Sequence, residues 1–164
     1  MTNEIKRNNW SRFCKKFNAS NQMRPTTVKL QSANQEETNS CSTAPFMGLE
    51  IVKKGRLIDG VSMFVGQEDP EQFNRPIAAV KRPVRMMLQK DSQGIDTHLS
   101  VEGEDGTVVR VELSGEKAPD QPQQMIAKLA YALYEQRDFT SGNDLDDWLK
   151  AEMQIRQIEQ QLTQ

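Results

Sequence analysis

The sequence predicts an α+β fold, in which an antiparallel β-meander carries an N-terminal amphipathic helix and is followed by a C-terminal α-helical hairpin. Apolar residues recur at every second position through much of residues 49–113, which is the pattern of strands with one buried face. A helical pattern precedes this stretch and two helical patterns follow it. We therefore divide the chain into an α+β domain at residues 1–115, a linker at 116–121 and a helical hairpin at 122–164.

The first predicted element is a helix that covers the sheet. Trp10, Phe13, Cys14 and Phe17 recur at helical spacing and form one apolar face. We expect Cys14 to be buried there as a small apolar residue. A strand is expected at 26–31, and the polar residues 32–43 predict a loop.

About five strands are expected in the central stretch, and the most specific prediction concerns its last hairpin. Residues that face each other across an antiparallel pair share a face, so Val101 pairs with Val109. This register leaves residues 104–106 as the loop, with Gly106 in the left-handed region that glycine tolerates. The other strand patterns lie at 49–51, 61–65 and 84–89, with 77–81 as an edge strand or connector.

Two helices are expected after the linker. The apolar residues of the first fill an arc wider than one partner helix requires, so this helix should contact its mate and either the sheet domain or another subunit. In the second helix, Leu145, Trp148 and Leu149 are expected to face the first helix. A further stripe has the spacing of a short coiled-coil seam, and its residues are Trp148, Ala151, Ile155, Ile158 and Leu162. We expect Ile155, Ile158 and Leu162 to be exposed.

The hairpin also carries a recognisable set of residues: Ala130-Tyr131, Tyr134-Glu135, Arg137, Gly142, Asp147-Trp148 and Ala151-Glu152. With this set, residues 122–153 resemble a short helix-loop-helix family of bacterial proteins whose function is not established. Two positions depart from the family pattern, because Tyr134 stands where the family often has Trp, and Asp138 where it has Gly.

A second set of residues spans the predicted α+β domain: Trp10, Phe13, Phe17, Val28, Gly66 and Pro83-Val84. Through them, residues 3–115 resemble another uncharacterised bacterial family with a helix and a β-rich body. Neither resemblance implies an activity.

Composition and charge narrow the class of protein. The chain has 164 residues and a net charge of -2. No apolar run approaches the about 20 residues of a membrane helix. The N-terminus lacks the apolar core of a secretory signal, so we expect a cytoplasmic protein.

The charge is distributed unevenly, since residues 1–31 carry a net charge of +6. This asymmetry supports an alternative function, binding of nucleic acid through Arg12, Lys15 and Lys16 together with a turn at Lys81 and Arg82. A solvated helix face explains the same charges and is the interpretation we prefer.

Candidate catalytic and metal-binding residues are few. The single histidine, His98, is expected to point outward from its strand, with no triad around it. Asp144, Asp146 and Asp147 lack the glycine and glutamate of a calcium loop and suit the first turn of a helix. We therefore expect no enzyme activity, no cofactor and no metal site.

The function favoured by the sequence is a non-enzymatic interaction or assembly module. Its hairpin would dock on a protein partner or on a second subunit. The residues expected to make this contact are Tyr131, Tyr134, Trp148, Ile155, Ile158 and Leu162. The sequence identifies neither the biological role nor the partner.

Overall fold

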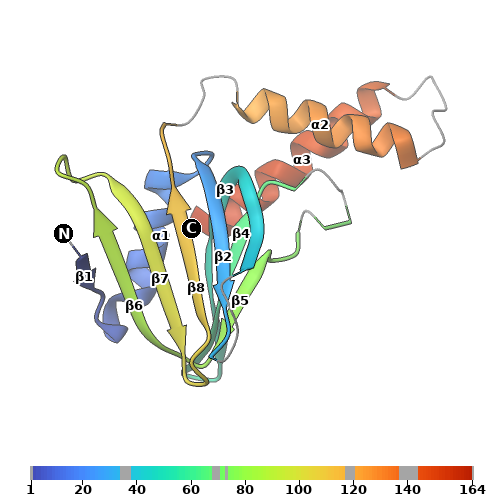
Figure 1. Cartoon of the computed structure of the whole chain (residues 1–164). Coiled ribbons are helices and arrows are strands. Elements are labelled where there is room, and N and C mark those ends of the chain that lie inside the picture. The colour runs from blue at the N-terminus through green and yellow to red at the C-terminus, as the bar shows by residue number, and fades with distance from the viewer. Residues whose placement is uncertain are drawn as a thin grey trace.

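An eight-stranded antiparallel sheet curls around one helix, and a helical hairpin packs on the outside of part of the sheet (Figure 1). The computed structural model describes residues 2–33, 38–67, 71–72, 74–116, 121–136 and 144–163. The predicted α+β class is confirmed, with the N-terminal helix and the C-terminal pair of helices in place. Most of the predicted linker, at 117–120, lies outside the described residues.

The elements follow one another along the chain in this order: β1 (Thr2–Glu4), the 3-10 turn η1 (Arg7–Asn9), α1 (Trp10–Asn21), β2 (Pro25–Gln31), β3 (Thr38–Lys54), β4 (Leu57–Val65), β5 (Ala78–Lys81), β6 (Pro83–Lys90), β7 (Asp96–Gly103), β8 (Val108–Leu113), α2 (Gln121–Gln136) and α3 (Asp144–Thr163).

The strand order is β1-β6-β7-β8-β2-β3-β4-β5, so two meanders are joined by the pairing of β2 with β8. The prediction of about five strands was too low. The loop predicted at 32–43 was wrong at 38–43, because these residues form the first part of β3 and pair with β2. The sequence did not indicate this strand, because its threonine, asparagine and serine residues form no apolar alternation. Main-chain pairing with β2 holds it in the sheet.

The sheet curls so far that the edge strand β5 continues into β6 after a single residue, Arg82. This residue adopts a φ of 48°, and its N–H donates to the Asp59 carbonyl at 2.8 Å. Its own carbonyl accepts the Glu104 N–H at 3.0 Å. The strands draw together at this corner and fan apart toward the other end (Figure 1).

The first core lies between α1 and the inner face of the curled sheet. Trp10, Cys14 and Phe17 are buried on the helix, as predicted. Every strand from β2 to β8 contributes at least one buried residue to the same cluster. Each fully buried aliphatic or aromatic side chain stabilises the fold by about 1.5–3 kcal/mol. Burial also raises the pKa of the Cys14 thiol to about 12, because a thiolate there would lose its hydration.

A second core lies on the opposite face of β3 and β4. Phe46 and Leu49 point toward α1, whereas Met47 points toward the hairpin, and Phe64 does the same on β4. On the hairpin side the cluster contains Met125, Ile126, Leu129, Ala151, Ile155, Ile158 and Leu162. These two strands are therefore the middle layer of three, covered by a helix on one face and by the hairpin on the other.

The Asn18 side chain joins the three layers. It is 1% exposed. Its Oδ1 accepts the Leu49 N–H at 2.7 Å, and its Nδ2 donates to the Leu49 carbonyl at 2.8 Å and to the Leu162 carbonyl at 2.6 Å. The last of these carbonyls lies in the final turn of α3, where helix carbonyls lack a partner within the helix. One amide thus connects α1, β3 and α3.

The predicted register of the last hairpin is confirmed. Val101 pairs with Val109, and the Gly103 N–H donates to the Thr107 carbonyl at 2.7 Å. Gly106 has a φ of 87°, and a Cβ added to it would lie 3.0 Å from the Ala33 Cβ.

We expect Gly106→Val to lower the free energy of unfolding by about 1–3 kcal/mol, because a β-branched residue is strained at this φ and would press on Ala33. Urea titration measures the loss. The matched control is Gly55→Val, at a turn residue that also has a positive φ but no atom within 4 Å of its added Cβ. An equal loss in both variants would show that the contact with Ala33 contributes nothing.

Candidate functional site

The hairpin has two apolar faces, and the protein covers only one of them. Ile155, Ile158 and Leu162 were expected to be exposed, and this is wrong, since all three are buried against β3, β4 and α1. The seam pattern was real, but its partner is a sheet within the same chain. Apolar spacing alone does not distinguish a helix that packs on a sheet from one that packs on another helix.

The uncovered face lies on the first half of α3. Leu145 is 71% exposed, Leu149 is 49% exposed and Met153 is 61% exposed, and Trp148 beside them is 36% exposed. Leu145, Trp148 and Leu149 were expected to face α2, and this is wrong for Leu145, most of whose side chain is exposed. The spacing of four residues from 145 to 149 to 153 was the signal for this second stripe.

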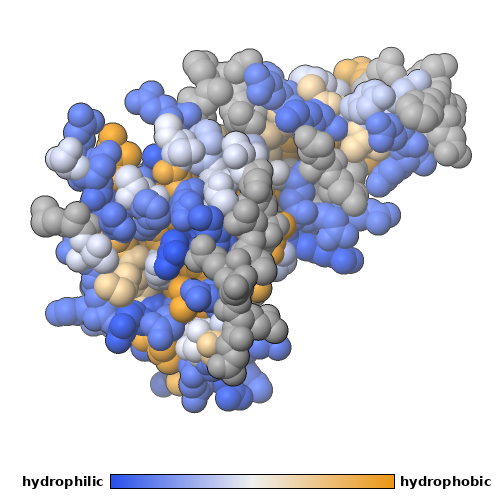
Figure 2. All heavy atoms as spheres, viewed as in Figure 1, coloured by the Kyte–Doolittle hydropathy of each residue, from blue (hydrophilic) through white to orange (hydrophobic). Residues whose placement is uncertain are grey.

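The uncovered face is exposed because of where the hairpin docks. The second half of α3 lies against the sheet, whereas α2 and the first half of α3 project beyond it (Figure 1). Hydrophobic residues therefore reach the surface of the projecting hairpin among mostly hydrophilic ones (Figure 2). We call Leu145, Trp148, Leu149 and Met153 the outer face of α3.

Two tyrosines predicted to contact a partner lie on α2. Tyr131 is 57% exposed and Tyr134 is half-buried, with their ring centroids 6.1 Å apart. An exposed aromatic residue on the projecting part of the hairpin is suited to a contact surface, because it supplies area at a low cost in conformational entropy.

The basic residues of the alternative function are all exposed: Arg12, Lys15 and Lys16 on α1, and Lys81 and Arg82 at the corner between β5 and β6. Arg7 connects the two groups, because its Nη1 donates to the Pro83 carbonyl at 2.8 Å. The start of α1 therefore lies beside the corner. Acidic residues are interspersed there, and the carboxylate of Glu104 lies 3.9 Å from the Arg82 guanidinium.

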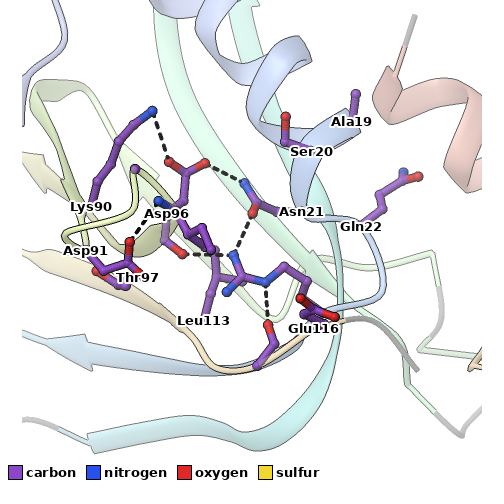
Figure 3. Close-up of a pocket in the computed structure, with 14 residues that line it drawn as sticks. Ala19, Ser20, Asn21, Gln22, Lys90, Asp91, Asp96, Thr97, Leu113 and Glu116 are labelled. Atoms are coloured by element: carbon purple, nitrogen blue, oxygen red, sulfur yellow. Dashed lines mark hydrogen bonds and ion pairs between the residues drawn. The ribbon is translucent and has the colours of Figure 1, made fainter. Parts of the chain in front are cut away.

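A polar cluster that the sequence did not predict lies where α1 ends (Figure 3). Arg24 is 9% exposed. Its Nε donates to the Gly115 carbonyl, and its Nη1 donates to Asn21 Oδ1 and to the Asp96 carbonyl, each at 2.8 Å. Asn21 Nδ2 donates to Asp96 Oδ2 at 2.9 Å, and Lys90 Nζ lies 3.6 Å from Asp96 Oδ1. These residues are far apart in the chain and have no motif spacing, so no sequence signal marks them.

The turn between β6 and β7 borders the same cluster. Asp91 Oδ1 accepts the N–H groups of Ile95 and Gln93 at 3.0 and 2.8 Å. These hydrogen bonds hold the pKa of Asp91 below its usual value, because they favour the carboxylate. Asp91 therefore adds a negative charge to the rim of the cluster at neutral pH.

In the part of the chain that the structure describes, no three side chains of His, Cys, Asp or Glu gather in an arrangement that could hold a metal ion. His98 lies on the outer side of β7, half-buried, and its Nδ1 has no hydrogen-bond partner. No helix in this part combines the length and the apolar content needed to cross a bilayer.

Comparison with known proteins finds a similarity in the region of the hairpin. A family model described as "Protein of unknown function (DUF2934)" matches residues 121–157, from the start of α2 into α3. The expected resemblance of the C-terminal region to an uncharacterised family is thereby confirmed, while the weaker resemblance of residues 3–115 stays a prediction. No curated protein and no solved structure matches the chain. The match stops before Ile158 and Leu162, which anchor the hairpin to the sheet.

We expect Ile155→Ala to lower the free energy of unfolding by about 2–5 kcal/mol, because a side chain that is 2% exposed leaves a cavity between α3 and the sheet. Trp148→Ala is the matched comparison on the outer face of the same helix and should cost less. Urea titration of both variants tests this. A larger loss for Trp148→Ala would place Trp148 in the core of the hairpin, as the sequence first suggested.

Proposed function

We propose that this protein is a non-enzymatic assembly module whose projecting hairpin pairs with the hairpin of a second copy. The observation that carries the proposal is the outer face of α3, where four large apolar side chains stay exposed on one side of a helix whose other side is fully used. Large exposed apolar faces on soluble proteins are commonly interaction surfaces.

The charges along α3 favour a second copy in the antiparallel direction. An antiparallel pairing centred on Leu149 sets Leu145 of one copy opposite Met153 of the other, so that the outer faces cover each other. The same arrangement brings the exposed Asp146 toward the exposed Lys150 of the second copy. Helix pairing through an apolar face flanked by opposite charges is a common mode of assembly.

The family match supports the proposal only in that it covers the same part of the chain, the hairpin. Residues 121–157 contain α2 and the whole outer face of α3, so the part of the chain that matches the family model is also the part that carries the exposed apolar residues. The sheet would then serve as the body that holds the hairpin by one face and leaves the other free.

The assembly state tests the proposal directly. We expect the intact chain to have twice the monomer mass in size-exclusion chromatography with light scattering, and Leu149→Glu to be monomeric because it buries a charge in the paired face. Gln123→Glu is the control, at an exposed position in the first turn of α2 and not on the outer face of α3, and should stay dimeric. A monomeric intact chain at every concentration would contradict self-pairing.

Point variants are needed here because removal of the hairpin is not a clean deletion. Met47 and Phe64 are buried beneath it and would become exposed if the chain ended after β8. Such a truncated protein would be expected to aggregate or unfold for reasons unrelated to assembly.

Binding of nucleic acid is the second candidate, supported by the position of Arg7 between the basic face of α1 and the Lys81 to Arg82 corner. If these residues contact phosphates, binding to a generic oligonucleotide should fall steeply with salt.

We expect no such binding at physiological salt, because carboxylates border the corner and the whole chain carries a net charge of -2. Fluorescence anisotropy with a labelled oligonucleotide measures it. Binding that is lost in Lys15→Glu/Lys16→Glu, but kept in a variant with two charge reversals at Lys128 and Lys150 on the hairpin, would favour the second candidate.

A further inference from the structure

A cleft of about 660 Å³ opens beside the polar cluster around Arg24. It lies between the end of α1, the turn from β6 to β7, and the end of β8 (Figure 3). The volume falls in the range of about 300–1,000 Å³ that is usual for small-molecule sites. Neither the hairpin nor the basic face of α1 contributes to it.

The guanidinium of Arg24 is buried, but only two of its three nitrogens donate hydrogen bonds to described residues. Nε and Nη1 donate to Gly115, Asn21 and Asp96, which fixes the plane of the group. Among the described residues, Nη2 has no hydrogen-bond partner, although Arg24 is only 9% exposed and lines the cleft. A held guanidinium with two free donors is suited to a carboxylate, which accepts strong charge-assisted hydrogen bonds.

The remaining charges exclude a simple anion as the best ligand. Lys90 and Asp96 lie within 3.6 Å and offset each other. Asp91 and Glu116 also line the cleft, and both are exposed. An anion bound at Arg24 would therefore meet two nearby carboxylates, unless the same molecule also carried a positive charge.

The cleft also has an apolar part. Ile95, in the turn before β7, is 43% exposed, and Leu113 lies at the end of β8. We propose that the cleft binds a small zwitterion with an apolar side chain, which is the chemistry of a free apolar amino acid. The carboxylate binds Arg24 Nη2, the ammonium group faces Asp91 and Glu116, and the side chain covers Ile95.

Three matched probes test the proposal on the intact chain by ¹H–¹⁵N correlation spectra. L-leucine carries both charges, N-acetyl-L-leucine carries only the carboxylate, and L-leucinamide carries only the ammonium group. We expect L-leucine to shift the amide signals of cleft residues such as Asn21 and Ile95, and each blocked probe to bind about tenfold more weakly, because one charged contact is lost. Equal binding of N-acetyl-L-leucine, or no shift of cleft residues with L-leucine, would overturn the proposal.

Two variants separate the ligand contacts from the stability of the fold. Glu116→Gln removes one carboxylate at an exposed position and should weaken L-leucine while leaving N-acetyl-L-leucine unchanged or tighter. Arg24→Lys keeps the charge but loses the planar fork, and should weaken both L-leucine and N-acetyl-L-leucine. The matched control is Glu135→Gln, at an exposed position of α2, which should bind as the unmodified chain does. Unchanged binding in Glu116→Gln would refute the role given to the ammonium group.

Discussion

The three-layer arrangement depends on the hydrogen bonds of one buried amide, that of Asn18. Pairing of β2 with β3 ends at Pro45, so Leu49 has no strand beside it on the edge opposite β4. The Asn18 side chain occupies that edge and satisfies both main-chain groups of Leu49. Its Nδ2 also donates to the Leu162 carbonyl and so binds the end of α3. An apolar residue of similar size would leave three buried main-chain groups without partners, which is a larger loss than one hydrogen bond.

The sequence predicts the inner face of the sheet well on β4, β6, β7 and β8, because the buried residues of these strands recur at every second position. It predicts the outer face of β3 and β4 poorly. Phe64 occupies a position that alternation assigns to solvent, whereas alternation places Met47 on the same face as Leu49, and the irregularity between Phe46 and Gly48 turns it outward. A strand covered on both faces also has no period of two to detect. The docking of α3 was missed for the same reason, since its apolar stripe packs on a face of the sheet that the sequence pattern does not show to be covered.

The candidate sites differ in how much of them the sequence contains. The outer face of α3 is present in the sequence as a second stripe of apolar residues, although the interpretation relied on the first stripe, that of Ile155, Ile158 and Leu162. The cleft around Arg24 is not present in any pattern, because its parts come from the end of α1, the turn after β6 and the end of β8. Only the curl of the sheet brings Asp96 within 2.9 Å of Asn21. The strand topology brings the residues of such a site together, so the spacing of residues along the sequence does not predict it.

The pairing of β2 with β8 has a consequence for how the chain folds. Each meander is made of neighbouring segments and can form from local contacts. The pairing of β2 with β8, in contrast, joins Thr26 to Leu113, which lies more than half the chain away. Contacts between distant segments slow folding, because the intervening chain must close a large loop first. The bond from Asn18 to Leu162 spans 144 positions. During synthesis, the face of β3 that carries Met47 must therefore avoid wrong partners until α3 has left the ribosome.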